Sequence, residues 1–167
     1  MRKLQAGACS FFMGRQVTGM KVLIDGDGCP VIAETERAAA LYGLEVLIFC
    51  DTSHLISSRT SRVILVDQGR DAADWAIISA VKKGDLVITQ DYGLASLVLS
   101  RKAYGFHQNG WQYRDENIES LLMERYEAGK ARRSARNRLK GPPKRDKKQN
   151  ELFFQRLCAF LGKVKDK

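Results

Sequence analysis

Residues 21–31, KVLIDGDGCPV, contain the clearest fold signal in the chain. The apolar run at residues 21–24 stops at residues 25–30, DGDGCP, and an apolar run ended by Gly, Asp and Pro predicts a buried strand. Pro30 suits the first turn of a helix, and the residues up to Tyr42 are rich in Ala, Glu and Arg before Gly43, a typical helix terminator. The segment therefore predicts a strand, a loop and a helix.

The same alternation continues along the chain. Further strands are predicted at residues 44–49, 62–66, 86–89 and 104–108, and further helices at residues 71–81, 94–102, 118–130 and 151–161. In the helix at 71–81, Trp75, Ile78 and Val81 have the spacing of one apolar face. Apolar strands that alternate with helices predict an α/β fold, a three-layer α/β/α sandwich with a mostly parallel central sheet and Rossmann-like topology.

The charge of the chain is concentrated near its C-terminus. The 167 residues include 28 Lys or Arg and 19 Asp or Glu, a net charge of +9, but residues 1–123 have a net charge of −1. Residues 130–148, KARRSARNRLKGPPKRDKK, hold ten basic residues and one acidic residue, and so match the net charge of the whole chain. A segment this basic is typical of an arm that contacts phosphate backbones, although it could also be a solvated tail.

The composition excludes several classes of protein. Hydrophobic residues make up 44% of the chain and charged residues 28%, which is ordinary for a globular domain. No uncharged run exceeds eleven residues, so no membrane span is expected. The N-terminus is a poor signal peptide, and the four cysteines form no C-x-x-C pair, so we expect reduced thiols and a cytoplasmic location.

Five aspartates lie just past the ends of predicted strands. Asp25 and Asp27 follow the first strand, Asp71 and Asp74 the third, and Asp91 the fourth. In an open α/β sheet, ligands bind outside the carboxyl ends of the strands, so these carboxylates should converge. Converging carboxylates repel one another unless a cation lies among them, and Mg²⁺ or Mn²⁺ prefers such oxygen ligands.

Each of these aspartates also has a simpler structural interpretation. Asp71 and Asp74 have the spacing of a helix N-cap and an acidic first turn. Asp27 and Asp91 could likewise be caps, and Asp25 a turn residue. Their shared position at one edge of the sheet favours a metal site over five unrelated caps.

Several blocks together resemble the YaiI/YqxD family, a bacterial group with a PIN-domain-like fold. The blocks are DGDGCPV (25–31), GRDAAD (69–74), KKGDLVITQDYGLASL (82–97), RDENI (114–118), GKARR (129–133) and KGPPK (140–144). The resemblance covers residues 20–161. The family usually has D-A-D-A-C-P, and Gly26 and Gly28 replace both alanines here.

The resemblance implies a PIN-like fold whose acidic cluster binds Mg²⁺ or Mn²⁺ and which, in true PIN domains, hydrolyses RNA. Carried over to this sequence, the metal ligands are Asp25, Asp27, Asp71, Asp74 and Asp91. The catalytic residues expected among them are Asp25, Asp27 and Asp91.

The predicted organisation has four parts. They are an N-terminal extension (1–19), a PIN-like α/β domain (20–129), a basic arm (130–148) and a C-terminal amphipathic helix that packs on the domain (149–167). The extension could also reflect a start codon assigned upstream of Met20. The candidate nucleic-acid-binding residues of the arm are Lys130, Arg132, Arg133, Arg136, Arg138, Lys140, Lys144 and Arg145.

Four further side chains are candidates for accessory roles: Cys29, Ser53, His54 and Thr89. The two hydroxyls could orient a phosphate or a metal-bound water, and His54 could act as a general base. Cys29 precedes a helix, which could activate its thiol, but a small, partly buried apolar residue is the simpler interpretation.

Three aromatic residues are candidate stacking surfaces for exposed bases. Tyr104, Trp111 and Tyr113 could serve in that way, as aromatic side chains do in single-strand binders. Packing in the core or at its rim is the simpler interpretation for all three.

The sequence thus predicts a metal-dependent phosphodiesterase acting on RNA or single-stranded nucleic acid. One alternative is a non-catalytic nucleic-acid-binding module, in which the carboxylates cap helices and the arm binds. Another is a phosphatase with Asp25 and Asp27 as nucleophile and acid/base. That class expects a small or β-branched residue where Cys29 stands, and an acidic pair after a strand, whereas Asp85 precedes one.

Overall fold

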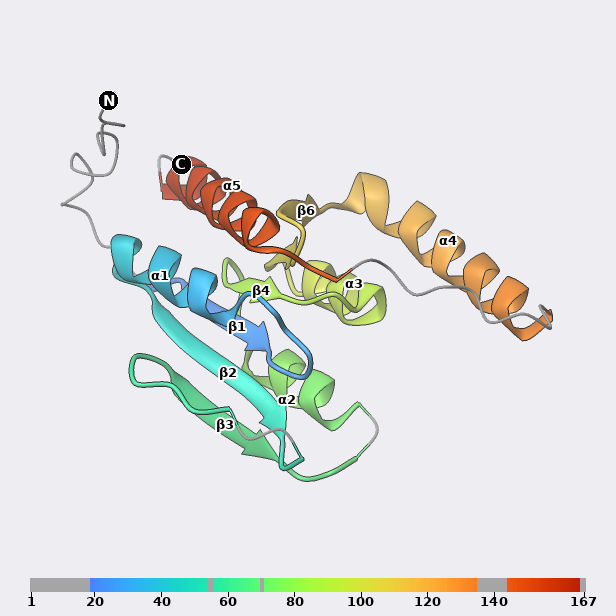
Figure 1. Cartoon of the computed structure of the whole chain (residues 1–167), viewed down its shortest axis with the longest axis horizontal. Helices are drawn as coiled ribbons and strands as arrows, with labels where there is room; N and C mark the ends of the chain where they lie inside the picture. The colour runs from blue at the N-terminus through green and yellow to red at the C-terminus, as the bar shows by residue number, and fades with distance from the viewer. Residues whose placement is uncertain (1–18, 54–55, 70, 135–143, 166–167) are drawn as a thin grey trace.

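The computed structural model describes residues 19–53, 56–69, 71–134 and 144–165, and its central feature is a six-stranded sheet (Figure 1). The strands are β1 (Lys21–Asp25), β2 (Glu45–Asp51), β3 (Arg62–Val66), β4 (Leu86–Ile88), β5 (Tyr104–His107) and β6 (Trp111–Tyr113). Their order is β3-β2-β1-β4-β5-β6, parallel except for the antiparallel pair β5–β6. The predicted α/β class and mostly parallel sheet are confirmed.

Helices cover both faces of the sheet. They are α1 (Ile32–Tyr42), α2 (Ala72–Ala80), α3 (Tyr92–Ser100), α4 (Asp115–Ser134) and α5 (Lys147–Lys165). Because successive strand residues point to opposite faces, Val22 and Ile24 join the apolar cluster under α1 and α5, while Leu23 joins the one under α2 and α3. Figure 1 shows α5 beside α1 and α4 running away from the sheet.

Trp75 differs from its predicted position. The helix forms as expected, but α2 buries Ala73, Ile77 and Ile78 against the sheet and leaves Trp75 66% exposed. The prediction that Trp75 belongs to the buried face is therefore wrong. The helix is apolar on most sides, so spacing alone could not select the face that packs on the sheet.

Two boundaries near the C-terminus differ from the predictions. After β5 the chain turns at residues 108–110 into β6, a strand too short for its alternation to be recognised in the sequence. The basic segment is helical at both described ends, since α4 continues to Ser134 and α5 begins at Lys147. Its residues 135–143, like residues 1–18 of the predicted extension, lie outside the described residues. None of the described helices is long and apolar enough to cross a membrane.

Candidate functional site

After β1, the strands β2 and β3 are added on one side of it and β4 to β6 on the other, so the strand order reverses between β1 and β4. A cavity of about 700 Å³ opens at the carboxyl ends of these two parallel strands. All five aspartates predicted from the sequence line this cavity, and so do Asp51 and part of α4. We call it the acidic cavity; its charged lining residues are Asp25, Asp27, Asp51, Asp71, Asp74, Asp91, Glu124, Arg125 and Arg132.

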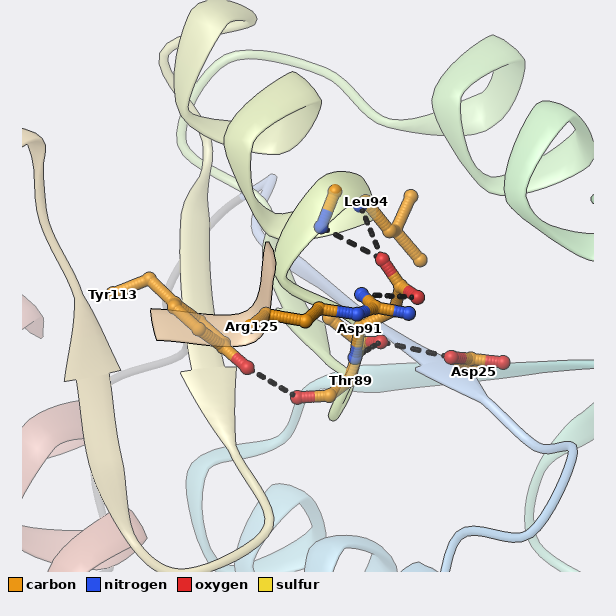
Figure 2. Close-up of polar contacts among 7 residues, drawn as sticks. Asp25, Thr89, Asp91, Leu94, Tyr113 and Arg125 are labelled. Carbon is orange, nitrogen blue, oxygen red and sulfur yellow. Dashed lines mark hydrogen bonds and ion pairs between the residues drawn. The ribbon is translucent and has the colours of Figure 1, made fainter. Parts of the chain in front are cut away.

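A chain of hydrogen bonds joins the ends of β1 and β4 (Figure 2). Thr89 Oγ1 donates to Asp25 Oδ2 at 2.8 Å and accepts from the backbone N–H of Asp91 at 3.0 Å. The buried hydroxyl of Tyr113 donates to the carbonyl of Thr89 at 3.2 Å. Thr89, predicted as an accessory residue, therefore fixes the orientation of Asp25.

Asp91 is the one member of the cluster whose capping interpretation is confirmed. Its Oδ1 accepts from the backbone N–H groups of Gly93 and Leu94 at 2.7 and 3.0 Å, at the start of α3. Its Oδ2 lies 2.9 Å from Arg125 Nη1. Burial raises the pKa of Asp91, but the amide of Leu94 and the Arg125 guanidinium outweigh it and hold that pKa below its usual value.

Asp71 and Asp74 lie at the start of α2 and are not held in this way. Asp71 occupies the N-cap position with φ of 61°, and its side chain accepts no capping hydrogen bond. Burial, reinforced by the charges of Asp25 and Asp91, raises the pKa of Asp74 to about 6. The pKa of Asp25 is also raised, mainly by burial, despite the hydrogen bond from Thr89. Neighbouring carboxylates therefore add to the effect of burial at both Asp25 and Asp74.

The loop after β1 is held close to β2. The backbone N–H of Asp51 donates to Asp27 Oδ1 at 3.1 Å, and that of Gly26 donates to the carbonyl of Phe49 at 2.7 Å. A Cβ on Gly26 would lie 2.8 Å from the same carbonyl oxygen, so glycine permits this close approach. The loop therefore brings Asp27 beside the end of β2.

Asp51 was missed by the sequence analysis. Asp51 ends β2, whereas the sequence predicts that this strand ends at Phe49. Once the strand is extended, Asp51 also lies at the carboxyl end of a parallel strand, where the other aspartates of the cavity were expected. Ser53, predicted as an accessory residue, donates its backbone N–H to Asp51 Oδ1 at 2.7 Å and its hydroxyl to the same atom. His54 lies outside the described residues.

One wall of the acidic cavity is formed by α4. Glu124, Arg125, Ala128 and Arg132 line it, and their spacing places them along one side of that helix. The two arginines bring positive charge to the wall, and Arg132 is also one of the predicted nucleic-acid-binding residues. No sequence signal pointed to Arg125, because its proximity to Asp91 depends on how α4 packs on α3.

The remaining predicted basic residues lie in different surroundings. Lys130 and Lys144 are exposed. Arg145 is half-buried and donates to the Gln108 carbonyl, Asn109 Oδ1 and Asn150 Oδ1 at 2.6 to 2.8 Å. The predicted residues that lie outside the described part of the chain, or whose side chains do, are Arg133, Arg136, Arg138 and Lys140.

Other candidates from the sequence are packed into the protein. Burial raises the pKa of the Cys29 thiol to about 11, so the thiol stays protonated at neutral pH. Tyr113 is fully buried, and Trp111 stacks on His107 with ring centroids 4.4 Å apart. Tyr104 packs edge-on against Phe160. The packing interpretation thus applies to these aromatic residues.

The donors of the acidic cavity suit a hard divalent cation by their chemistry. They are carboxylate oxygens, and positive charge among them would relieve the repulsion that helps to raise the pKa of Asp25 and Asp74. Among the residues that the structure describes, however, no three His, Cys, Asp or Glu side chains are already arranged to hold a metal ion. Metal binding therefore stays a prediction.

The fold and site define an α/β protein with a carboxylate-lined cavity at the switch point of a parallel sheet. A family profile described as "Uncharacterized BCR, YaiI/YqxD family" matches residues 23–163, and the chain belongs to this family. A UPF0178 protein of Clostridium acetobutylicum is 44% identical over 149 residues, covering 87% of this chain and 100% of that relative. One from Exiguobacterium sibiricum is 42% identical, covering 88% and 100%. No solved structure matches the chain.

Proposed function

We propose that the protein is a metal-dependent phosphodiesterase that hydrolyses RNA or another single-stranded nucleic acid. One observation carries the proposal: carboxylates from the ends of β1 and β2 and the starts of α2 and α3 line a single cavity, with arginines on its α4 wall. Carboxylates crowded without cations are unfavourable for the fold, so their assembly needs a functional reason.

Within this proposal, the residues that would hold Mg²⁺ or Mn²⁺ are Asp25, Asp27, Asp71 and Asp74. Bound there, the metal would supply a nucleophilic water at neutral pH and stabilise charge on the phosphate. Asp91 would contribute less, because one of its carboxylate oxygens caps α3 and the other contacts Arg125. Asp91, predicted as a metal ligand and a catalytic residue, would then chiefly position α3 and Arg125.

The protein's own residues account for orientation and substrate charge. Thr89 holds the Asp25 carboxylate through a 2.8 Å hydrogen bond. Arg125 and Arg132 place guanidinium groups, which pair well with phosphate oxygens, on the wall facing the acids. Positive charge on α4 and in the basic segment would offset the repulsion between an acidic cavity and a polyanion.

The phosphatase alternative receives less support. Asp85, the acid nearest β4 on its N-terminal side, accepts hydrogen bonds from the backbone N–H groups of Lys21 and Lys82 at 2.9 and 2.8 Å. Lys21 begins β1 and Asp25 ends it, so Asp85 lies at the N-terminal ends of the strands and Asp25 at their carboxyl ends. Asp85 therefore acts as a structural acceptor and not as a partner of the acidic cavity.

We also propose a cytoplasmic location. Cys29 and Cys50 are free cysteines, as is usual for proteins of reducing compartments.

The test is cleavage of an end-labelled single-stranded RNA by the purified protein in Mn²⁺. We expect cleavage that EDTA abolishes and that Asp25→Asn and Asp27→Asn each reduce by about a hundredfold or more, as is typical when one group that supports transition-state stabilisation is lost. Asp115→Asn, on the exposed first turn of α4, is the matched control and should cleave normally. Binding without cleavage in Mn²⁺ would support the non-catalytic binding module instead.

A further inference from the structure

Trp75 is the most exposed of the large apolar side chains on the described surface. Its helix, α2, buries Ala73, Ile77 and Ile78, while 66% of Trp75 is accessible to solvent. Tryptophan gains more than most residues from burial, so a tryptophan left this exposed is a candidate binding residue when other apolar groups adjoin it.

Such groups adjoin it in a second cavity, of about 310 Å³, between α2 and α3. Trp75 and Ile78 line it from α2, and Leu94 and Leu97 line it from α3. We call this cavity the Trp75 groove. Leu97 is itself 46% exposed, so the groove presents apolar surface from both helices.

The Trp75 groove adjoins the acidic cavity. Asp71, Asp74, Asp91 and Arg125 line both of them. An apolar slot bounded by an indole therefore adjoins the carboxylates and the guanidinium of the proposed catalytic site. A ligand that occupies both must have a flat apolar part next to a charged part.

A nucleotide within a single strand has this shape, with an aromatic base linked through a sugar to a phosphate. We propose that the Trp75 groove binds one base of the single-stranded substrate by stacking on the Trp75 indole while the neighbouring phosphate lies in the acidic cavity. This inference rests on the proposed function and adds a base subsite to it. Stacking on an aromatic side chain tolerates every base and requires an unpaired one, so the site selects single strands over duplexes.

The size of the groove favours a base over a protein partner. Stable protein interfaces bury about 800 Å² on each partner, far more than the walls of a slot of 310 Å³ offer. Two of the three aromatic residues that the sequence offered for stacking, Trp111 and Tyr113, are packed together with His107.

The inference is tested by binding of a short labelled single strand in Ca²⁺, which allows affinity to be measured separately from turnover. We expect Trp75→Ala to weaken binding about tenfold and Trp75→Phe to weaken it less, since a smaller ring still stacks. Tyr126→Ala is the matched control, because Tyr126 is an equally exposed aromatic residue, at 64%, that lines neither cavity. It should leave the affinity unchanged.

A second strand in which abasic sites replace the bases isolates stacking from phosphate contacts. The wild-type protein should bind it more weakly than the complete strand, and Trp75→Ala should not weaken that binding further. Equal affinity of the wild type and Trp75→Ala for the complete strand would overturn the base subsite. A dimer that Trp75→Ala dissociates, without any dependence on bases, would overturn it in favour of self-association.

The subsite and the proposed hydrolysis can fail separately. If the wild type cleaves RNA in Mn²⁺ and Trp75→Ala binds and cleaves equally well, the subsite is wrong and the phosphodiesterase stands. If no cleavage occurs but binding depends on Trp75 and on bases, the subsite stands and the hydrolysis is wrong.

Discussion

We call the contact of α5 and the residues just before it with α1 and the β5–β6 turn the α5 seam. Charged side chains in the α5 seam have ion-pair or hydrogen-bond partners, whereas carboxylates in the acidic cavity lie close to other carboxylates. In the seam, Arg37 Nη2 lies 3.0 Å from Glu151 Oε2, and the Arg145 guanidinium reaches Asn109 and Asn150. In the cavity, burial and neighbouring carboxylates raise the pKa of Asp74 to about 6.

The difference separates residues that hold the fold from residues that are available for function. The seam also buries Phe153, Leu157 and Leu161, so its polar and apolar contacts both favour the folded state. The cavity instead keeps Asp25 and Asp74 in surroundings that oppose their ionisation. Mutations in the seam should therefore destabilise the protein. Mutations that remove the least favourable carboxylates of the cavity should stabilise the metal-free protein.

The largest effect is expected for Phe153→Ala in the seam. Phe153 is fully buried, with its ring 6.0 Å from that of Phe106, and loss of a buried phenyl group creates a cavity. We expect the free energy of unfolding, measured in urea, to fall by about 3–5 kcal/mol. Leu152→Ala, on the exposed side of the same helix turn, is the control and should change it by less than about 1 kcal/mol. Equal losses for both variants would contradict a structural role for the seam.

Arg145→Ala should have the next largest effect. Its guanidinium donates to Gln108, Asn109 and Asn150, so its removal leaves these acceptors without a charged donor. We expect a loss of about 2 kcal/mol in the free energy of unfolding. Lys144→Ala, next to it and exposed, removes the same charge and should leave stability unchanged. If the two variants instead weaken nucleic-acid binding equally without any loss of stability, Arg145 belongs to the basic arm as predicted from the sequence.

A smaller effect should appear in the pH dependence of the free energy of unfolding, through His107 at the end of β5. Burial, with a contribution from the charge of Arg145, lowers the pKa of His107 from 6.5 to about 4. Because the folded state then binds the proton less readily than the unfolded state, the stability due to neutral His107 is complete above pH 6.5 and declines toward pH 4. Between pH 7 and pH 5 the wild type should lose about 1–2 kcal/mol more than His107→Gln. Parallel pH curves for the two proteins would show that His107 titrates normally.

Local patterns predicted the sheet and most of the acidic cavity. Asp25, Asp71 and Asp91 were placed correctly because each follows an apolar run, and the carboxyl ends of parallel strands meet at one edge. Asp51 was missed through an error of two residues in a strand end, which is a local error of the kind that better strand boundaries would correct.

The α4 wall and the Trp75 groove could not be predicted from the sequence. Arg125 reaches Asp91 across 34 positions through the packing of α4 on α3, which leaves no periodic or motif signal. Trp75 and Ile77 are both apolar residues of α2, and only the docking of that helix on the sheet decides which one is buried. The sequence patterns therefore do not predict which side chains reach the site through helix packing.

The central claim, that the crowded carboxylates of the acidic cavity serve a divalent cation, is tested most directly by thermal unfolding of the wild type and Asp74→Asn with and without Mn²⁺. In EDTA at pH 7.5, Asp74→Asn removes a carboxylate whose ionisation the fold opposes, so it should be the more stable protein, by about 1 kcal/mol or less because the group is partly screened by solvent. Saturating Mn²⁺ should stabilise the wild type more than the variant and reverse their order. Identical shifts in both proteins, or no shift in either, would contradict the claim.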